Sequence, residues 1–135
     1  MLTQEGWQEM IIVTGGAYQG KLLVAKSVCK KENPVIAEGE KADEKELEQA
    51  DIIAHFQLYI RHLLEKGIEP EKQVQELLQK NPNVILEITQ LGCGVVPMDA
   101  FDRNYREQVG RISCKIAESA EAVYLVNCGI PKRLK

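Results

Sequence analysis

The residues best suited to chemistry lie near the start of the chain, in a glycine-rich segment at positions 15–22. Its spacing, G-x-x-x-x-G-K, is typical of phosphate-binding loops. In such loops the glycines let consecutive backbone N–H groups face a polyphosphate, while the lysine and the following helix N-terminus add positive charge. We therefore predict that ATP or GTP phosphates bind here, at Gly15, Gly16, Ala17, Tyr18, Gln19, Gly20, Lys21 and Leu22.

The last position of this segment departs from the pattern. A complete motif has Ser or Thr after the lysine, and its hydroxyl ligates Mg²⁺, whereas Leu22 offers no oxygen. We therefore predict no metal site and impaired Mg²⁺-assisted transfer. A glycine-rich turn without any ligand is the alternative. The apolar run at 10–13 before the segment and the helical spacing of Leu22, Ala25 and Cys29 after it favour the phosphate loop.

Two other residues are candidates for acid–base or nucleophilic catalysis. Glu87 lies inside the apolar run 84–88, where an unpaired carboxylate is costly, so it is paired, at a solvated strand end, or directed at a site. His55 follows an apolar run at 52–54 and has the chemistry of a base or a nucleophile. The simpler interpretation of each is structural: a carboxylate at a solvated strand end, and a packed or exposed histidine.

A second loop, at residues 89–97, leaves the apolar run 84–88 and enters a long helix. Gly92 and Gly94 flank Cys93, which indicates a tight loop that allows close approach. Cys93 is either a reactive thiol or a small packed residue. The helix carries Arg103, Arg106 and Arg111 away from its apolar stripe, where they either meet phosphate or a neighbouring subunit, or are simply solvated.

The composition limits the class of protein. The 135 residues are 44% hydrophobic and 27% charged, which predicts one globular domain spanning residues 1–135. Seventeen basic against twenty acidic residues leave a net charge of −3, so we expect neither nucleic acid nor a membrane surface as partner. The polar start and the lack of a long apolar stretch predict a cytoplasmic protein. Four scattered cysteines and two histidines indicate free thiols rather than zinc or disulfides.

The apolar periodicity predicts an α/β fold with a mostly parallel sheet and flanking helices. Strands are expected at 10–13, 35–36, 52–56, 84–88 and 122–127, with helices after Gly20, around 58–66, from Pro70 and from Asp99. The charged stretch 38–46 is expected to be an exposed loop or a solvated helical turn, and the basic end 132–135 a solubilising tail. In such a sheet, ligands bind beyond the carboxyl ends of the strands.

Four segments together resemble the adenosylcobinamide kinase/adenosylcobinamide-phosphate guanylyltransferase family. They are 14–21 (TGGAYQGK), 91–97 (LGCGVVP), 105–111 (YREQVGR) and 129–132 (GIPK). The resemblance implies a three-layer fold of the P-loop/RecA-like type, here truncated, and a homo-oligomer, a trimer in that family. It also implies a nucleotide and a corrinoid as binding partners. The substrate loop would comprise Gln90, Gly92, Cys93, Gly94 and Arg106.

The chain departs from the family pattern at several separate places. Leu22 replaces the serine, Ala54-His55 replaces an acidic residue and cysteine, and Thr89-Gln90 replaces Asn-Glu. Glu107 and Ser113 stand where the family has Asp and Asn, and the segment that carries the histidine nucleophile has no counterpart in 31–50.

We therefore predict a nucleotide- or phosphate-binding protein with impaired catalysis and no confident catalytic residue. The alternatives are an active adenosylcobinamide kinase and a structural or assembly module without nucleotide.

Overall fold

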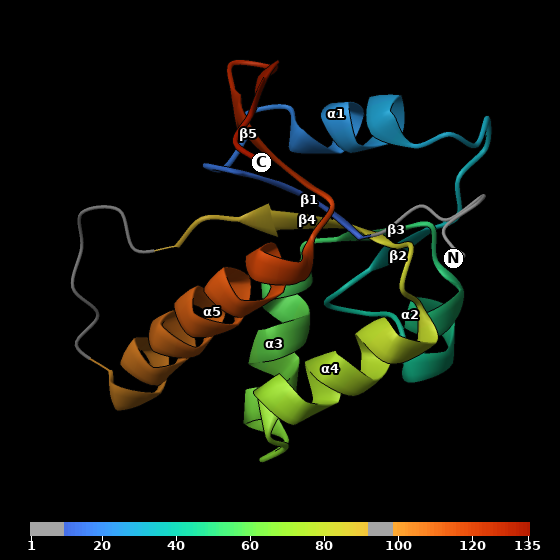
Figure 1. The fold of residues 1–135 in the computed structure, drawn as a ribbon. Helices are drawn as coiled ribbons and strands as arrows, with labels where there is room; N and C mark the ends of the chain where they lie inside the picture. Colours follow the sequence, from blue (N-terminus) through green and yellow to red (C-terminus); the bar gives the residue numbers. More distant parts are fainter. Residues whose placement is uncertain (1–9, 92–98) are drawn as a thin grey trace.

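A computed structural model describes residues 10–91 and 99–135 of the chain. Its centre is a six-stranded sheet with the spatial order β2-β3-β4-β1-β5-β6 (Figure 1). The strands are β1 (Ile11–Gly15), β2 (Ile36–Glu38), β3 (Ile52–Ala54), β4 (Ile85–Thr89), β5 (Ala122–Asn127) and β6 (Ile130–Arg133). The helices are α1 (Lys21–Val28), α2 (Glu44–Gln49), α3 (Phe56–Glu65), α4 (Pro70–Lys80) and α5 (Ala100–Ser119).

The first five strands pair in parallel, and β6 pairs with β5 in the antiparallel direction. Strand β1 occupies the middle of the sheet, between β4 and β5. Its register with β4 joins Ile11 to Ile85 and Gly15 to Thr89. The carboxyl ends of β1 to β5 therefore meet along one edge, the edge at which ligands bind in open α/β sheets.

Helices cover both faces of this sheet, which makes three layers (Figure 1). Successive residues of β1 point to opposite faces, so Ile11 and Val13 pack under α1, while Ile12 faces the larger core formed with α2 to α5. The smaller core also contains Val24 and Ala25 of α1. The predicted three-layer α/β fold with a mostly parallel sheet, of the P-loop type, is therefore confirmed.

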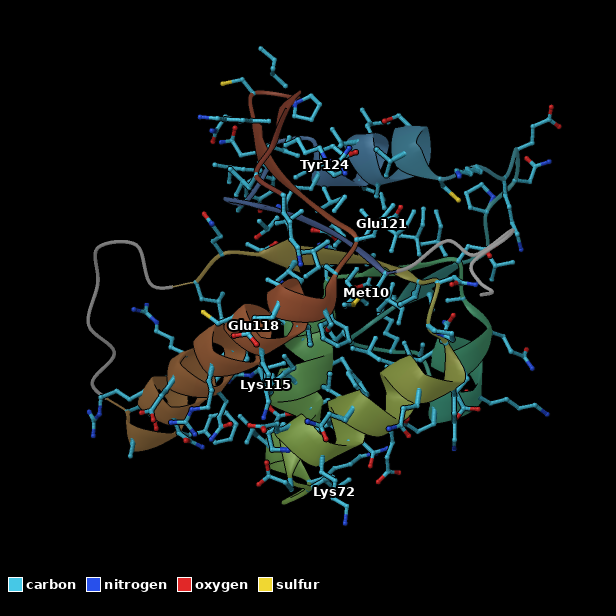
Figure 2. The ribbon with its side chains drawn as sticks, in the orientation of Figure 1. Met10, Lys72, Lys115, Glu118, Glu121 and Tyr124 are labelled. Atoms are coloured by element: carbon cyan, nitrogen blue, oxygen red, sulfur yellow. The ribbon has the colours of Figure 1, made fainter. Side chains whose placement is uncertain are left out.

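Local sequence signals explain where several helices begin. Asp99 accepts the backbone N–H of Phe101 at 2.7 Å and caps α5, and Pro70 occupies the first turn of α4. Across the outer surface, Lys115 of α5 forms an ion pair with Glu71 of α4; Lys115 is labelled in Figure 2. No helix in residues 10–91 and 99–135 is long and apolar enough to cross a membrane.

The charged stretch 38–46 agrees with the expectation of loop or solvated helical turn: after Glu38, the last residue of β2, it forms a turn and then the first turn of α2, which starts with a capping box between Asp43 and Glu46. One sequence-based expectation needs correction. The basic end is not a solubilising tail, because residues 130–133 form β6. Positive φ angles at Cys128 and Gly129 close a two-residue turn that returns the chain along β5.

Candidate nucleotide-binding site

The glycine-rich segment connects β1 to α1 at the carboxyl edge of the sheet. Gly15 is the last residue of β1 rather than the first residue of the loop. A Cβ at position 15 would lie 2.5 Å from the carbonyl oxygen of Val126, so only glycine lets β1 and β5 approach this closely. Gly20 has φ of 86°, and a Cβ there would lie 3.2 Å from the Cα of Gly129. The backbone of the loop is thereby fixed against the β5–β6 hairpin.

Gln19 adds two hydrogen bonds to this attachment. Its side-chain Oε1 accepts the N–H of Cys128 at 2.6 Å, and its carbonyl oxygen accepts the N–H of Gly129 at 2.8 Å. The hairpin that sequence analysis took for a basic tail therefore holds the tip of the loop in place.

The loop leaves backbone donors available. Gly20 precedes α1 and provides no side-chain cap. The first hydrogen bond of the helix runs from the N–H of Val24 to the carbonyl of Gly20, at 3.3 Å. The N–H groups of the residues before Val24 in the first turn therefore have no acceptor within the helix. The N–H groups of Gly16, Ala17 and Tyr18 likewise find no acceptor within residues 10–91 and 99–135. Tyr18 is fully exposed, and Leu22 packs toward the α1 core, so neither side chain fills the loop. These N–H groups, at residues 16–18 and in the first turn of α1, are the donors offered to a phosphate, and we call them the cradle.

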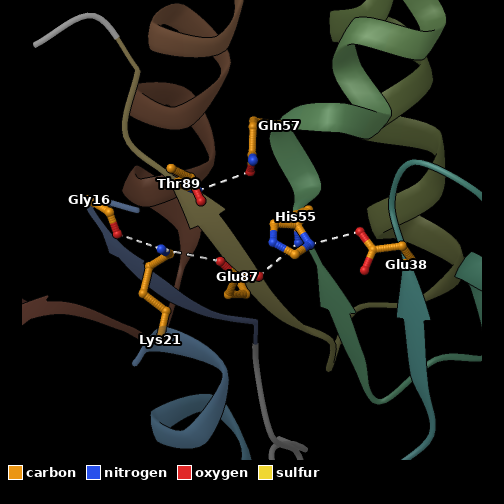
Figure 3. A network of polar contacts seen from close by, with 7 residues as sticks. All are labelled: Gly16, Lys21, Glu38, His55, Gln57, Glu87 and Thr89. Atoms are coloured by element: carbon orange, nitrogen blue, oxygen red, sulfur yellow. Dashed lines mark hydrogen bonds and ion pairs between the residues drawn. The ribbon is translucent and has the colours of Figure 1, made fainter. Parts of the chain in front are cut away.

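Lys21 is buried at the start of α1, with 6% of its surface exposed. Its Nζ donates a hydrogen bond to the carbonyl oxygen of Gly16 at 2.6 Å, across the loop, and lies 3.7 Å from Oε2 of Glu87 (Figure 3). A buried ammonium is stable only with such partners. The lysine of the motif therefore lies in the loop and is paired with a carboxylate.

Glu87 is also buried, with 3% exposed, in the middle of β4. Its second oxygen, Oε1, accepts the backbone N–H of His55 at 2.9 Å. Of the roles considered from the sequence, the solvated strand end is wrong and the paired carboxylate is correct. One carboxylate thus joins the loop lysine to the end of β3, because β4 lies between β1 and β3.

His55 connects β3 to α3 in a left-handed conformation, with φ of 54°. Its Nδ1 lies 2.8 Å from Oε1 of Glu38 at the end of β2, and nearly half of its side chain, 46%, is exposed. Figure 3 shows the imidazole between Glu38 and Glu87. Of the roles considered from the sequence, a packed histidine is therefore excluded, since the ring is partly exposed and hydrogen bonded.

Sequence analysis missed Glu38 and Gln57 as parts of this edge. The side-chain oxygen of Gln57 accepts a hydrogen bond from the N–H of Thr89 at 3.0 Å. The backbone carbonyl oxygen of Gln57 accepts a hydrogen bond from the hydroxyl of Tyr105, also at 3.0 Å. Burial raises the pKa of Tyr105 to about 12, so its hydroxyl remains a donor. The available signal was position: Glu38 ends a strand, and Gln57 lies two residues after His55.

The predicted substrate-loop residues are placed in part. Gln90 and Arg106 line one cavity of about 600 Å³ between the sheet and α5. Gly92, Cys93 and Gly94 lie outside the described residues. The cavity walls are mainly apolar, from Ile12, Ile88, Val109 and Val123, with the hydroxyls of Thr14 and Thr89 at the carboxyl edge. Two separately predicted residues thus share one hollow next to the loop strand.

Comparison with known proteins identifies the family. The model of the cobinamide kinase / cobinamide phosphate guanyltransferase family matches residues 52–134, well over half of the chain. The chain belongs to this family. The match includes His55, Glu87, Gln90 and Arg106, whereas the glycine-rich loop precedes it.

Two curated relatives carry the printed name bifunctional adenosylcobalamin biosynthesis protein CobU. The protein from Salmonella typhimurium is 32% identical over 74 residues, and the protein from Escherichia coli K12 is 33% identical over 76 residues. Each alignment covers 53% of this chain and 41% of the relative. The chain therefore matches about two-fifths of the length of these relatives.

Proposed function

We propose that this chain binds ATP or GTP through residues 15–22 and that its Mg²⁺-assisted transfer is impaired. The observation that carries the proposal is that the N–H groups of Gly16, Ala17 and Tyr18 have no acceptor among the described residues, while the buried Lys21 bonds across the same loop to the carbonyl of Gly16. Membership of a nucleotide-using family of cobalamin biosynthesis supports the same assignment. The β- and γ-phosphates would accept from the loop N–H groups and from Lys21.

The impairment is argued from the oxygen ligands that the loop lacks. Leu22 packs toward the α1 core and has no hydroxyl. Ala54, the last residue of β3, and His55 stand where the family pattern has an acidic residue and a cysteine. Glu87 already interacts with Lys21 and with the N–H of His55. Among the described residues no group of three or more His, Cys, Asp or Glu side chains is placed to hold a metal ion. Phosphoryl transfer depends largely on charge neutralisation by the metal, so its rate should be low.

Titration calorimetry with ATP and GTP tests the binding. Lys21→Ala should weaken binding at least tenfold, because the lysine supplies the only positive side chain found in the loop. Lys26→Ala, which removes an exposed lysine of the same helix, is the matched control and should bind within about twofold of the unmodified chain. Equal binding by Lys21→Ala and the unmodified chain would refute the proposal.

An active adenosylcobinamide kinase is the second candidate, and the position of Glu87 favours it. This carboxylate reaches the end of β3, where the acidic residue is missing, and so partly restores the expected charge. Incubation with adenosylcobinamide and ATP or GTP would give phosphorylated product that is absent with Lys21→Ala. If neither nucleotide binds or shifts the melting temperature, a structural or assembly module is the better description.

The proposal also includes that the chain binds a corrinoid and that it forms a homo-oligomer, which the family resemblance implies is a trimer. Only part of a corrinoid, such as its side chain, would fit the cavity next to Gln90 and Arg106. Arg106→Ala should then weaken binding of cobinamide without changing the affinity for nucleotide. Sedimentation analysis would measure the oligomeric state directly.

A further inference from the structure

His55 and Glu38 form a hydrogen-bonded pair that the family pattern does not assign. Glu38 ends β2 beside Ala54 of β3, in the parallel register of the two strands. Gly39 follows directly, and its N–H donates to the carbonyl of Ala54 at 2.7 Å. A Cβ at position 39 would lie 2.5 Å from the carbonyl oxygen of His55. The backbone at this glycine therefore holds the carboxylate next to the imidazole.

The pair fixes the protonation pattern of the ring. A carboxylate only accepts hydrogen bonds, so Nδ1 carries the proton in the contact with Glu38, and the lone pair of the neutral ring resides on Nε2. This arrangement, a carboxylate on one nitrogen and a free lone pair on the other, is that of an oriented general base. About half of the side chain is exposed, so an incoming molecule can reach it.

The pair is also connected to the phosphate loop. The N–H of His55 donates to Glu87, whose other oxygen pairs with Lys21 (Figure 3). The charged groups that face this end of β3 are Glu38 from β2, Glu87 from β4 and, behind Glu87, Lys21 from α1. The left-handed backbone conformation of His55 is uncommon for residues other than glycine, and such conformations concentrate at functional sites.

We propose that His55, oriented by Glu38, is the general base for the oxygen that attacks a nucleotide bound at residues 15–22. Nε2 takes the proton of the attacking water or alcohol as the new O–P bond forms to the γ-phosphorus. The bond from that phosphorus to the β–γ bridging oxygen breaks, and the nucleoside diphosphate leaves. The pair would supply the residual transfer chemistry of a site with impaired metal assistance. This inference rests on the proposed nucleotide binding.

Release of inorganic phosphate from ATP and GTP by the full chain, with water as acceptor, tests the proposal. His55→Gln should lower turnover at least about a hundredfold, the smaller end of what general bases contribute, with nucleotide affinity unchanged within about twofold. The chain has two histidines, so His62→Gln is the matched control and should leave turnover unchanged. Wild-type turnover in His55→Gln, or no turnover above that of Lys21→Ala in the unmodified chain, would overturn it.

Glu38→Gln separates orientation from simple structural support. The carboxylate holds the imidazole in one orientation through Nδ1, so its loss should reduce turnover. Nitrogen-15 spectra of the imidazoles supply a readout independent of turnover: His55 should carry its proton on Nδ1 and lose that preference in Glu38→Gln. Unchanged turnover and an unchanged spectrum would contradict the role of Glu38.

Failure of this inference can be told apart from failure of the proposed function. If calorimetry detects nucleotide binding while His55→Gln behaves as wild type, only this inference fails. If binding itself is absent, the proposed function fails.

Discussion

The carboxyl edge of the sheet has two halves that are held together by different means. In the half around β1 and β5, the loop is held by backbone contacts, at Gly15 against Val126 and Gly20 against Gly129. In the half around β2, β3 and β4, side chains make the connections, through Glu87, His55 and Glu38. Of the residues that depart from the family pattern, those at positions 54–55 and 89–90 lie in this second half, whereas Leu22 lies in the first.

The difference shows which features tolerate side-chain exchange. A position where a Cβ would contact backbone at 2.5 Å accepts only glycine, so the geometry of the cradle is specified by sterics. A carboxylate, in contrast, can reach the same point from a neighbouring strand, as Glu87 of β4 reaches the end of β3. We infer that the backbone half specifies phosphate geometry, whereas the side-chain half specifies chemistry.

Removal of Glu87 is expected to have the largest effect. Glu87→Ala leaves Lys21 buried without its carboxylate partner, which should lower the free energy of unfolding by about 3–5 kcal/mol. Urea denaturation measures this loss. Glu87→Gln keeps the volume and an acceptor for His55, so it should cost less and should tighten nucleotide binding, because Lys21 no longer has a competing anion. Weaker binding by Glu87→Gln would contradict this account of the pair.

Gly15→Ala tests the backbone half. The new methyl group would contact the carbonyl of Val126, and relief requires β1 or β5 to move, at a cost of about 2–4 kcal/mol in unfolding free energy. Gly67→Ala is the control: φ is 73° there, but the Cβ meets open space, so only the backbone term of about 1 kcal/mol applies. Equal losses in the two variants would show that the contact with Val126 is unimportant.

Tyr105→Phe tests how α5 supports the side-chain half. The hydroxyl donates to the carbonyl oxygen of Gln57, and its removal should cost about 1 kcal/mol in unfolding free energy. Because Gln57 also accepts the N–H of Thr89, the amide resonance of Thr89 should shift in this variant. Phe101→Leu, on the same helix, should leave that resonance in place. An unshifted Thr89 resonance in Tyr105→Phe would show that the hydrogen bond from α5 to Gln57 does not affect the bond between Gln57 and Thr89.

The smallest effect on the free energy of unfolding, and one that depends on pH, is expected at Asp51, at the amino edge of the sheet. Burial opposes ionisation of Asp51, but the N–H of Val35 and the Lys31 ammonium hold the pKa of its carboxyl below the usual value. The stability that Asp51 contributes is thus present above its unfolded pKa and is lost as pH falls through the folded one. Asp51→Asn should be less stable by up to about 1 kcal/mol at neutral pH, with the difference shrinking in acid. A difference independent of pH would exclude the ionised carboxylate as its source.

Sequence reasoning located the elements whose signals are local. Asp99 before α5, Pro70 at the start of α4 and the run 84–88 of β4 could be read directly, because caps and apolar runs act within a few residues. The strand β6 was missed, since its apolar content is low and its turn depends on a positive φ at Cys128, a residue type with no preference for that conformation.

The polar network at the carboxyl edge was predicted less well, because it depends on strand order. Glu87 is 66 residues from Lys21 in the sequence, and nothing local indicates that β4 lies between β1 and β3. The same holds for Glu38 and His55, whose contact follows from the pairing of β2 with β3. Gly15 and Lys21, by comparison, belong to one continuous motif and were found together.

Nucleotide affinity measured with and without Mg²⁺ tests most directly whether the cradle works without a metal. Calorimetry with ATP and GTP, in excess Mg²⁺ and again in a chelator, should give dissociation constants that agree within about threefold for the unmodified chain, and under both conditions Lys21→Ala should bind at least tenfold more weakly. Binding that Mg²⁺ tightens tenfold or more, and that the chelator abolishes, would contradict the proposal, because it would require protein oxygens to ligate the metal at this loop.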